Sequence, residues 1–101
     1  MKQTVVHYKA KPAAIAENTK LLENVFQELH AKPVDGVRYL TLKLGDGSYV
    51  HFTITDGDGV NPITQLDSFR AYVSGVRDRI EAPPTQTNDV TIVGNYRMLA
   101  P

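Results

Sequence analysis

The clearest pattern in the chain is an alternation of apolar and polar residues along positions 37–55. Apolar side chains occupy every second position on both sides of the segment Gly45-Asp46-Gly47: Leu40, Leu42, Leu44, Val50, Phe52 and Ile54. Because successive side chains of a strand point to opposite faces, this period of two predicts a β-hairpin.

The loop of this hairpin decides which residues pair. A two-residue Asp46-Gly47 loop would place Leu42 opposite His51, whereas a three-residue loop with Gly47 in the left-handed region places Leu42 opposite Val50. A slip of one residue moves apolar side chains to the wrong face, so burial favours the three-residue loop. One face is then aliphatic, and the other carries Tyr39, Thr41, Lys43, Tyr49, His51 and Thr53.

The segments around the hairpin predict two helices and two more strands. Residues 4–9 form a strand with Thr4, Val6 and Tyr8 on one face, and residues 12–32 form a helix. Asn18 lies near the middle of the apolar arc of that helix, where a polar side chain is unexpected. A second helix opens at Asn61-Pro62, or at Thr64 as an alternative cap, and runs to about residue 80. Residues 90–97 alternate as the last strand.

The element order strand, helix, strand, strand, helix, strand predicts an α+β fold of the ferredoxin-like βαββαβ type. Helices that cross between non-adjacent parallel strands give a four-stranded antiparallel sheet with both helices on one face. We expect a single domain over residues 1–101, with the aliphatic hairpin face beneath the helices. The second face must then contact water, a ligand or another chain.

Composition removes several classes of function. The chain has 11 basic and 11 acidic residues, so it lacks the net positive charge that attracts nucleic acids or anionic membranes. It has no cysteine, which excludes disulfides, thiolate nucleophiles and cysteine-based metal sites. No signal-like or membrane-spanning apolar run is present, so a cytoplasmic protein is expected.

Several short segments resemble the dimeric α/β-barrel proteins related to antibiotic-biosynthesis monooxygenases, and most closely a small subgroup without an assigned activity. The matching segments are Val5-Val6-His7-Tyr8-Lys9-Ala10-Lys11-Pro12, Glu17-Asn18, Gly36-Val37-Arg38-Tyr39, Asn61-Pro62, Phe69, Arg77-Asp78-Arg79 and Val93-Gly94-Asn95-Tyr96. In such proteins two ferredoxin-like protomers pack their open sheet faces into a barrel. The resemblance therefore implies a homodimer, and the polar hairpin face supplies the expected interface: Tyr39, Thr41, Tyr49, His51 and Thr53.

Some of these relatives oxidise polycyclic aromatic substrates with molecular oxygen and no metal, and some degrade haem. Thr53-Ile54-Thr55 stands where such relatives often carry a tryptophan, and the second helix has no haem-handling histidine. The resemblance therefore supports a prediction of the fold better than it supports a prediction of the activity.

Metal and nucleic-acid sites find little support in the residue pattern. Asp56, Asp58 and Asp67 do not follow the ligand spacing of an EF-hand and read as a hydrated turn. His7 and His51 share the predicted open face with no carboxylate at a matching position. The tyrosines of that face invite a base-stacking interpretation, but the basic residue and aromatic spacing of the RNA-recognition signature are absent. We expect no metal, no cofactor and no nucleic acid.

A cleft between sheet and helices is the best candidate site. Its expected lining is Tyr8, Asn18, Phe52, Tyr72 and Arg79, a mixture of apolar walls and few polar groups that is typical of small-molecule pockets. The alternative is that Asn18 bonds to Tyr8 or to backbone inside an ordinary core. Two functions follow from the cleft: binding of a small, partly aromatic metabolite, or a cofactor-free oxygenase in which Asn18 and Tyr8 steer an oxyanion. No nucleophile–base pair or carboxylate dyad is recognisable.

Overall fold

The computed structural model describes residues 1–57 and 59–99, so the predicted turn aspartate Asp58 lies outside the described residues. Four strands form one sheet in the order β2-β3-β1-β4, and every neighbouring pair is antiparallel. The strands are β1 (Lys2–Lys9), β2 (Val37–Lys43), β3 (Ser48–Thr55) and β4 (Thr85–Thr87).

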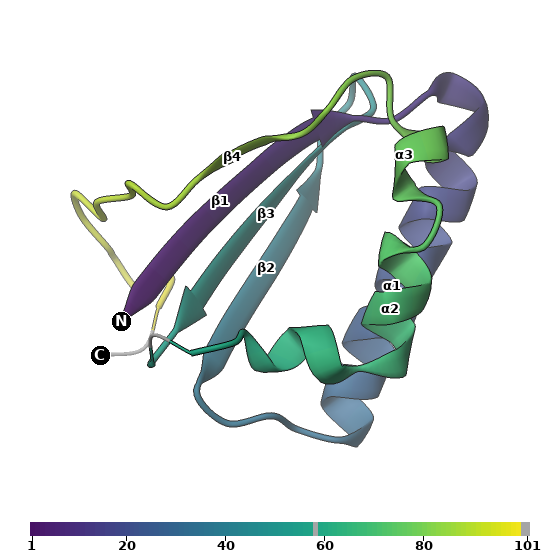
Figure 1. Ribbon diagram of the computed structural model, residues 1–101. Helices are drawn as coiled ribbons and strands as arrows, with labels where there is room; N and C mark the ends of the chain where they lie inside the picture. Colours follow the sequence, from purple (N-terminus) through teal and green to yellow (C-terminus); the bar gives the residue numbers. More distant parts are fainter. Residues whose placement is uncertain (58, 100–101) are drawn as a thin grey trace.

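The helical segments form a second layer on one side of this sheet (Figure 1). They are η1 (Pro12–Ala14), α1 (Ile15–Ala31), η2 (Pro62–Gln65), α2 (Asp67–Val73) and α3 (Val76–Arg79). Glu28 of α1 accepts hydrogen bonds from the backbone nitrogen and the hydroxyl of Ser68, which ties α1 to the first turn of α2. The expected α+β ferredoxin-like fold is confirmed.

The hairpin has the predicted register. Leu42 pairs with Val50 and Leu40 with Phe52. Gly47 takes a left-handed φ of 88°, and the backbone nitrogen of Leu44 donates to the carbonyl of Ser48 at 2.8 Å. The three-residue loop is therefore confirmed.

The prediction of which hairpin face lies under the helices was wrong. Tyr8 pairs with Tyr49 and Val6 with His51 across β1 and β3, so these side chains share one face. That face meets the helices: the hydroxyls of Tyr49 and Thr19 lie 2.7 Å apart, and the Tyr39 ring stacks on Phe26.

The residues assigned to an intersubunit face therefore lie under the helices: Tyr39, Thr41, Tyr49, His51 and Thr53. The aliphatic face is the one turned away from the helices: Leu40, Leu42 and Leu44 are 45%, 50% and 43% exposed, whereas Ile54 near the end of β3 is buried. Phe52 belongs to this open face and not to the cleft, and His7 lies on it while His51 faces the helices. A polar face can lie beneath helices here because its hydroxyl and ring nitrogen atoms find hydrogen-bond partners there.

The second predicted helix is divided into shorter segments. Asn61 accepts a hydrogen bond from the backbone nitrogen of Ile63 and so caps η2, as expected, whereas Thr64 does not cap α2. The helix breaks at Ser74, and Gly75 adopts a left-handed φ of 79° before α3. The turn redirects α3 so that Arg79 is buried, while Val73 at the end of α2 is exposed.

The last strand also differs from its prediction. β4 is the three-residue segment Thr85–Thr87 and pairs with β1. Residues 90–97, whose alternation predicted the strand, pair with no other strand in the described part of the chain. Alternation shows that the side chains of a segment suit a strand, but it does not show which backbone the segment would pair with.

The core lies between the two layers and combines aliphatic side chains with tyrosines. Leu22 and Val25 of α1 meet Leu66 and Ile80 from the second half of the chain. Within the described residues, no helix has the length and apolar character needed to cross a membrane.

Candidate functional site

A cavity of about 320 Å³ opens between the sheet and the segments η2 and α2. Its walls follow β1 from Val6 to Lys2 and β3 from His51 to Thr55, a length of about 13 Å at the usual rise of a strand. Tyr39, His51 and Tyr72 form one end, and among the described residues of the lining only Lys2 is charged. Ile63 and Phe69 supply apolar walls on the helical side.

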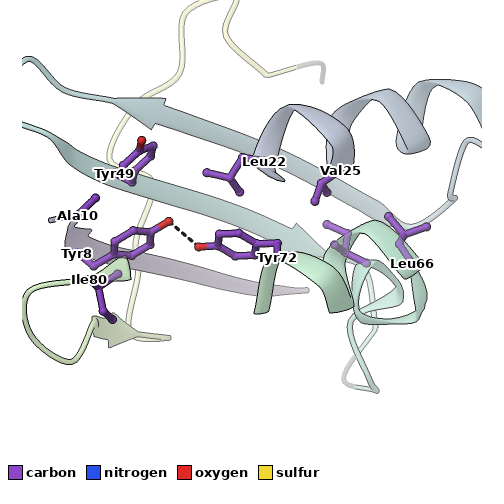
Figure 2. Close-up of a cluster of buried hydrophobic side chains, with 9 residues drawn as sticks. Tyr8, Ala10, Leu22, Val25, Tyr49, Leu66, Tyr72 and Ile80 are labelled. Carbon is purple, nitrogen blue, oxygen red and sulfur yellow. Dashed lines mark hydrogen bonds between the residues drawn. The ribbon is translucent and has the colours of Figure 1, made fainter. Parts of the chain in front are cut away.

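The polar end of this cavity continues into a buried hydrogen-bond cluster. The hydroxyl oxygens of Tyr8 and Tyr72 lie 2.5 Å apart, and Figure 2 shows the two rings meeting end to end beneath α1. His51 Nε2 lies 3.1 Å from the Tyr8 oxygen and 3.4 Å from the Tyr72 oxygen. His51 Nδ1 lies 2.6 Å from the Tyr39 hydroxyl and 3.2 Å from that of Thr41.

Asn18 and Arg79 stand behind Tyr8, away from the cavity. Arg79 Nε donates to the Asn18 side-chain oxygen at 3.1 Å, and Asn18 Nδ2 donates to the Tyr8 oxygen at 3.0 Å. The guanidinium also donates to the carbonyls of Ser74 and Tyr72 and lies over the Tyr72 ring at 5.6 Å from its centroid. Arg79 therefore fixes the end of α2 and the orientation of Asn18 together.

Burial keeps the groups of this cluster neutral near pH 7. Desolvation lowers the pKa of His51 to about 4, so the imidazole carries no charge. Desolvation also raises the pKa of Tyr39 to about 12 and the pKa values of Tyr8 and Tyr72 above their usual range. The hydrogen bond from Asn18 opposes the shift for Tyr8. The cluster consequently offers one uncharged base among three phenols.

The structure brings together four of the five residues predicted for the cleft. Tyr8, Asn18, Tyr72 and Arg79 form one hydrogen-bonded chain, but only Tyr72 of these lines the cavity itself. Phe52 is separate from them because it points to the opposite face of the sheet.

Sequence reasoning missed the role of His51 as the junction of the cluster. Part of the signal was present, because Tyr8 was already expected to face the helices, and residues that pair across two antiparallel strands lie on the same face. Pairing of the first strand with residues 48–55 would therefore have placed His51 beside Tyr8. The sequence did not show which strand the first one pairs with.

A second cavity of about 360 Å³ lies between α1 and the strands β2 and β3. Phe26, Leu22 and Tyr49 line it together with the exposed side chains Glu23 and Lys43. The Tyr49 hydroxyl is occupied by Thr19 and the carbonyl of Ile15, so this cavity lacks the interconnected polar groups of the first. Across the described residues, no three histidine or acidic side chains gather as a metal site would require.

No family model matches the chain, and no curated protein matches it. Solved structures do match. A Bacteroides thetaiotaomicron protein, provisionally described as an antibiotic biosynthesis monooxygenase, aligns with a TM-score of 0.78 over 97% of this chain and 95% of its own, at 11% identity. A Caulobacter crescentus protein of the same provisional description gives a TM-score of 0.67 over 89% of this chain and 90% of its own, at 19% identity.

A Nitrosomonas europaea protein of unknown function also aligns, with a TM-score of 0.67 over 98% of this chain and 96% of its own, at 17% identity. The expected resemblance to antibiotic-biosynthesis-monooxygenase-like proteins is therefore confirmed as a likeness of fold. Because the identities are low and one neighbour has no known activity, the function must be argued from the site.

Proposed function

We propose that this protein binds a small, partly aromatic molecule in the cavity between the sheet and α2. The observation that carries the proposal is the polar end of the cavity, where Tyr39, His51 and Tyr72 converge on a space walled by Ile63 and Phe69. Ligand pockets typically combine apolar walls with a few such convergent polar groups. A planar ring can stack against the aromatic walls while its oxygen substituents meet the hydroxyls.

We also propose that the binding unit is a homodimer formed through the open sheet face. This face presents Leu40, Leu42 and Leu44 to solvent and has Phe52 beside them. A contiguous apolar surface of this kind marks an interaction site on a folded protein. The cavity lies on the other face of the same sheet, so dimerisation would leave it accessible.

The binding proposal is tested with 2-naphthol, a two-ring phenol, followed by amide chemical shifts in NMR spectra. We expect shifts at residues lining the cavity and loss of binding in Val6→Phe, which fills the cavity beside His51. Val5→Phe is the matched control because Val5 points to the opposite face. Equal binding by Val6→Phe, or no binding at millimolar 2-naphthol, would contradict the proposal.

A cofactor-independent monooxygenase is a second candidate, favoured by the neutral imidazole of His51 among phenols. A naphthol ligand would donate its phenolic hydrogen bond to a tyrosine hydroxyl of this cluster and supply the electrons itself. One atom of O₂ would enter the ring and the other would leave as water, so that naphthol and O₂ give naphthoquinone and water. Oxygen consumption with 1-naphthol that is lost in His51→Gln supports this activity; binding without oxygen uptake leaves a binding protein.

A further inference from the structure

Buried Arg79 fixes the direction of hydrogen bonds through the whole cluster. A guanidinium has only donors, so the Asn18 atom that faces Arg79 Nε must be the side-chain oxygen. The amide nitrogen then faces Tyr8 and donates to its oxygen. The orientation of this amide is thus set by chemistry and has no alternative.

Tyr8 consequently has one proton and one remaining lone pair for its two other partners, Tyr72 and His51. Two proton orders satisfy the shortest contacts that link Tyr72, Tyr8, His51 and Tyr39. In the first, Tyr72 donates to Tyr8, Tyr8 donates to His51 Nε2, and Nδ1–H donates to Tyr39. In the second, Tyr39 donates to Nδ1, Nε2–H donates to Tyr8, and Tyr8 donates to Tyr72.

The two orders leave different ends of the cluster free. The first leaves the Tyr39 proton free to donate and a lone pair of Tyr72 free to accept; the second reverses these roles. Each ring nitrogen of His51 is assigned to its nearer hydroxyl: Nε2 to Tyr8 at 3.1 Å and not to Tyr72 at 3.4 Å, and Nδ1 to Tyr39 at 2.6 Å and not to Thr41 at 3.2 Å. Both free ends face the cavity, since Tyr39 and Tyr72 line it.

We propose that Arg79 and Asn18 act as positioning residues that hold this cluster in one of two proton orders, so that the polar end of the cavity presents one hydroxyl donor and one hydroxyl acceptor on either side of His51. The matching ligand carries a carbonyl and a hydroxyl on one aromatic frame. Its binding selects the order and with it the tautomer of His51. This inference rests on the proposed binding function and adds the chemical class of the ligand.

Two near-isosteric variants force opposite tautomers. In Tyr72→Phe, Tyr8 keeps its bond from Asn18 and must donate to Nε2, so His51 becomes the Nδ1–H tautomer. In Asn18→Asp, the carboxylate accepts the Tyr8 proton, Tyr8 accepts from both other partners, and His51 becomes the Nε2–H tautomer. Tyr49→Phe is the matched control because Tyr49 stacks on Tyr8 but makes no hydrogen bond with the cluster.

The first measurement is the pair of ring nitrogen chemical shifts of His51 in ¹⁵N-labelled protein. We expect Tyr72→Phe and Asn18→Asp to show opposite tautomers, and Tyr49→Phe to match the wild type. The same tautomer in both variants would overturn the proposed proton orders. If one variant does not fold, the ligand ranking below tests the inference on the wild-type protein.

The second measurement compares three probes of similar size: 4-hydroxyacetophenone, 4-methoxyacetophenone and 4-ethylphenol. In wild-type protein we expect 4-hydroxyacetophenone to bind at least about tenfold more tightly than either analogue, because each analogue leaves one buried hydroxyl without a partner. In Asn18→Asp both free ends are acceptors, so the advantage over 4-ethylphenol disappears. A purely structural role of Asn18 would weaken all three probes alike.

The results of these binding measurements distinguish a failure of this inference from a failure of the proposed binding function. Binding of 2-naphthol with no preference among the three probes overturns the inference and leaves the binding function standing. Binding of none of the four compounds overturns the binding function together with the ligand class. The ring nitrogen shifts of the variants then decide the proton orders independently.

Discussion

Arg79 is a buried cation without a carboxylate partner. It is 5% exposed, and within the described residues the one ion pair joins Arg70 and Asp67 on the surface. Burying an ion costs several kcal/mol unless other groups replace its hydration. Here the carbonyls of Ser74 and Tyr72, the Asn18 oxygen and the Tyr72 ring take that role. The side chain therefore ties α1 to the α2–α3 turn.

His51 gives the protein a pH-dependent stability. Burial lowers its pKa from about 6.5 to about 4, so between these pH values the unfolded state binds a proton that the folded state does not. This contribution to stability is fully present above pH 6.5 and is lost as the pH falls towards 4. We expect a loss of about 2 to 3 kcal/mol between pH 7.5 and 4.5 in urea unfolding.

The variant His51→Gln isolates this effect from other groups that titrate at low pH. It should unfold with a flatter pH profile, because its side chain takes up no proton in the unfolded state. His30→Gln is the control for the loss of a histidine side chain, since His30 is exposed near the end of α1 and lies outside the cluster. Parallel profiles for wild type and His51→Gln would contradict the low pKa.

At the scale of the elements, the hairpin depends on one glycine. Gly47 has a φ of 88°, which costs an alanine about 1 to 2 kcal/mol. An added Cβ would also lie 3.1 Å from Ile15 Cδ1, where the hairpin loop meets the start of α1.

We expect Gly47→Ala to lower the free energy of unfolding by about 1 to 2 kcal/mol, measured in urea. Gly45→Ala is the matched control in the same loop, because its φ is not left-handed and no atom lies within 4 Å of the added Cβ. If Gly47→Ala proved as stable as Gly45→Ala, the loop would relax without cost, which would contradict the expectation.

The hairpin also shows how far the sequence determines the fold. Alternation and turn chemistry predicted its strands, register and loop, because each depends on neighbouring residues. Alternation defines two faces but does not state which face the helices cover. Choosing the aliphatic face for burial overlooked Thr19, a polar residue of α1 that needs a polar partner on the sheet, and did not extend the expected contact of Asn18 with Tyr8 to the neighbouring strand. The partners are Tyr8 for Asn18 and Tyr49 for Thr19, and their face is the covered one.

The other differences between the predicted and the observed structure also arise from contacts between segments that are distant in the sequence. A helix from residue 62 to 80 was predicted from apolar spacing, but Gly75 takes a left-handed conformation that turns the chain and buries Arg79. The sequence grouped four residues that the structure joins by hydrogen bonds, Tyr8, Asn18, Tyr72 and Arg79, but it assigned His51 to the wrong face. Its position follows from the pairing of β1 with β3, a contact between segments distant in the chain.

At the scale of the whole molecule, the two layers leave the chain with one covered and one uncovered sheet face. The covered face holds the polar cluster and the cavity, and the other face is the aliphatic one, exposed at Leu40, Leu42 and Leu44 but buried at Ile54. Hydrophobic burial therefore remains incomplete in the isolated chain, and each exposed leucine of β2 could still gain by leaving water. A second copy supplies an identical apolar face, which allows a symmetric contact. The absence of net charge removes long-range repulsion between the copies.

We therefore expect light scattering of the untagged protein to give twice the chain mass over a range of concentrations. Leu42→Glu should give a monomer, because it places a charge at the centre of the aliphatic row and would bury it without a partner. Val73→Glu is the matched control, since Val73 is similarly exposed but lies on α2, away from this face. A wild-type protein that stays monomeric would contradict the dimer and leave the aliphatic face to a different macromolecule. A dimer that survives Leu42→Glu would place the contact elsewhere on the molecule.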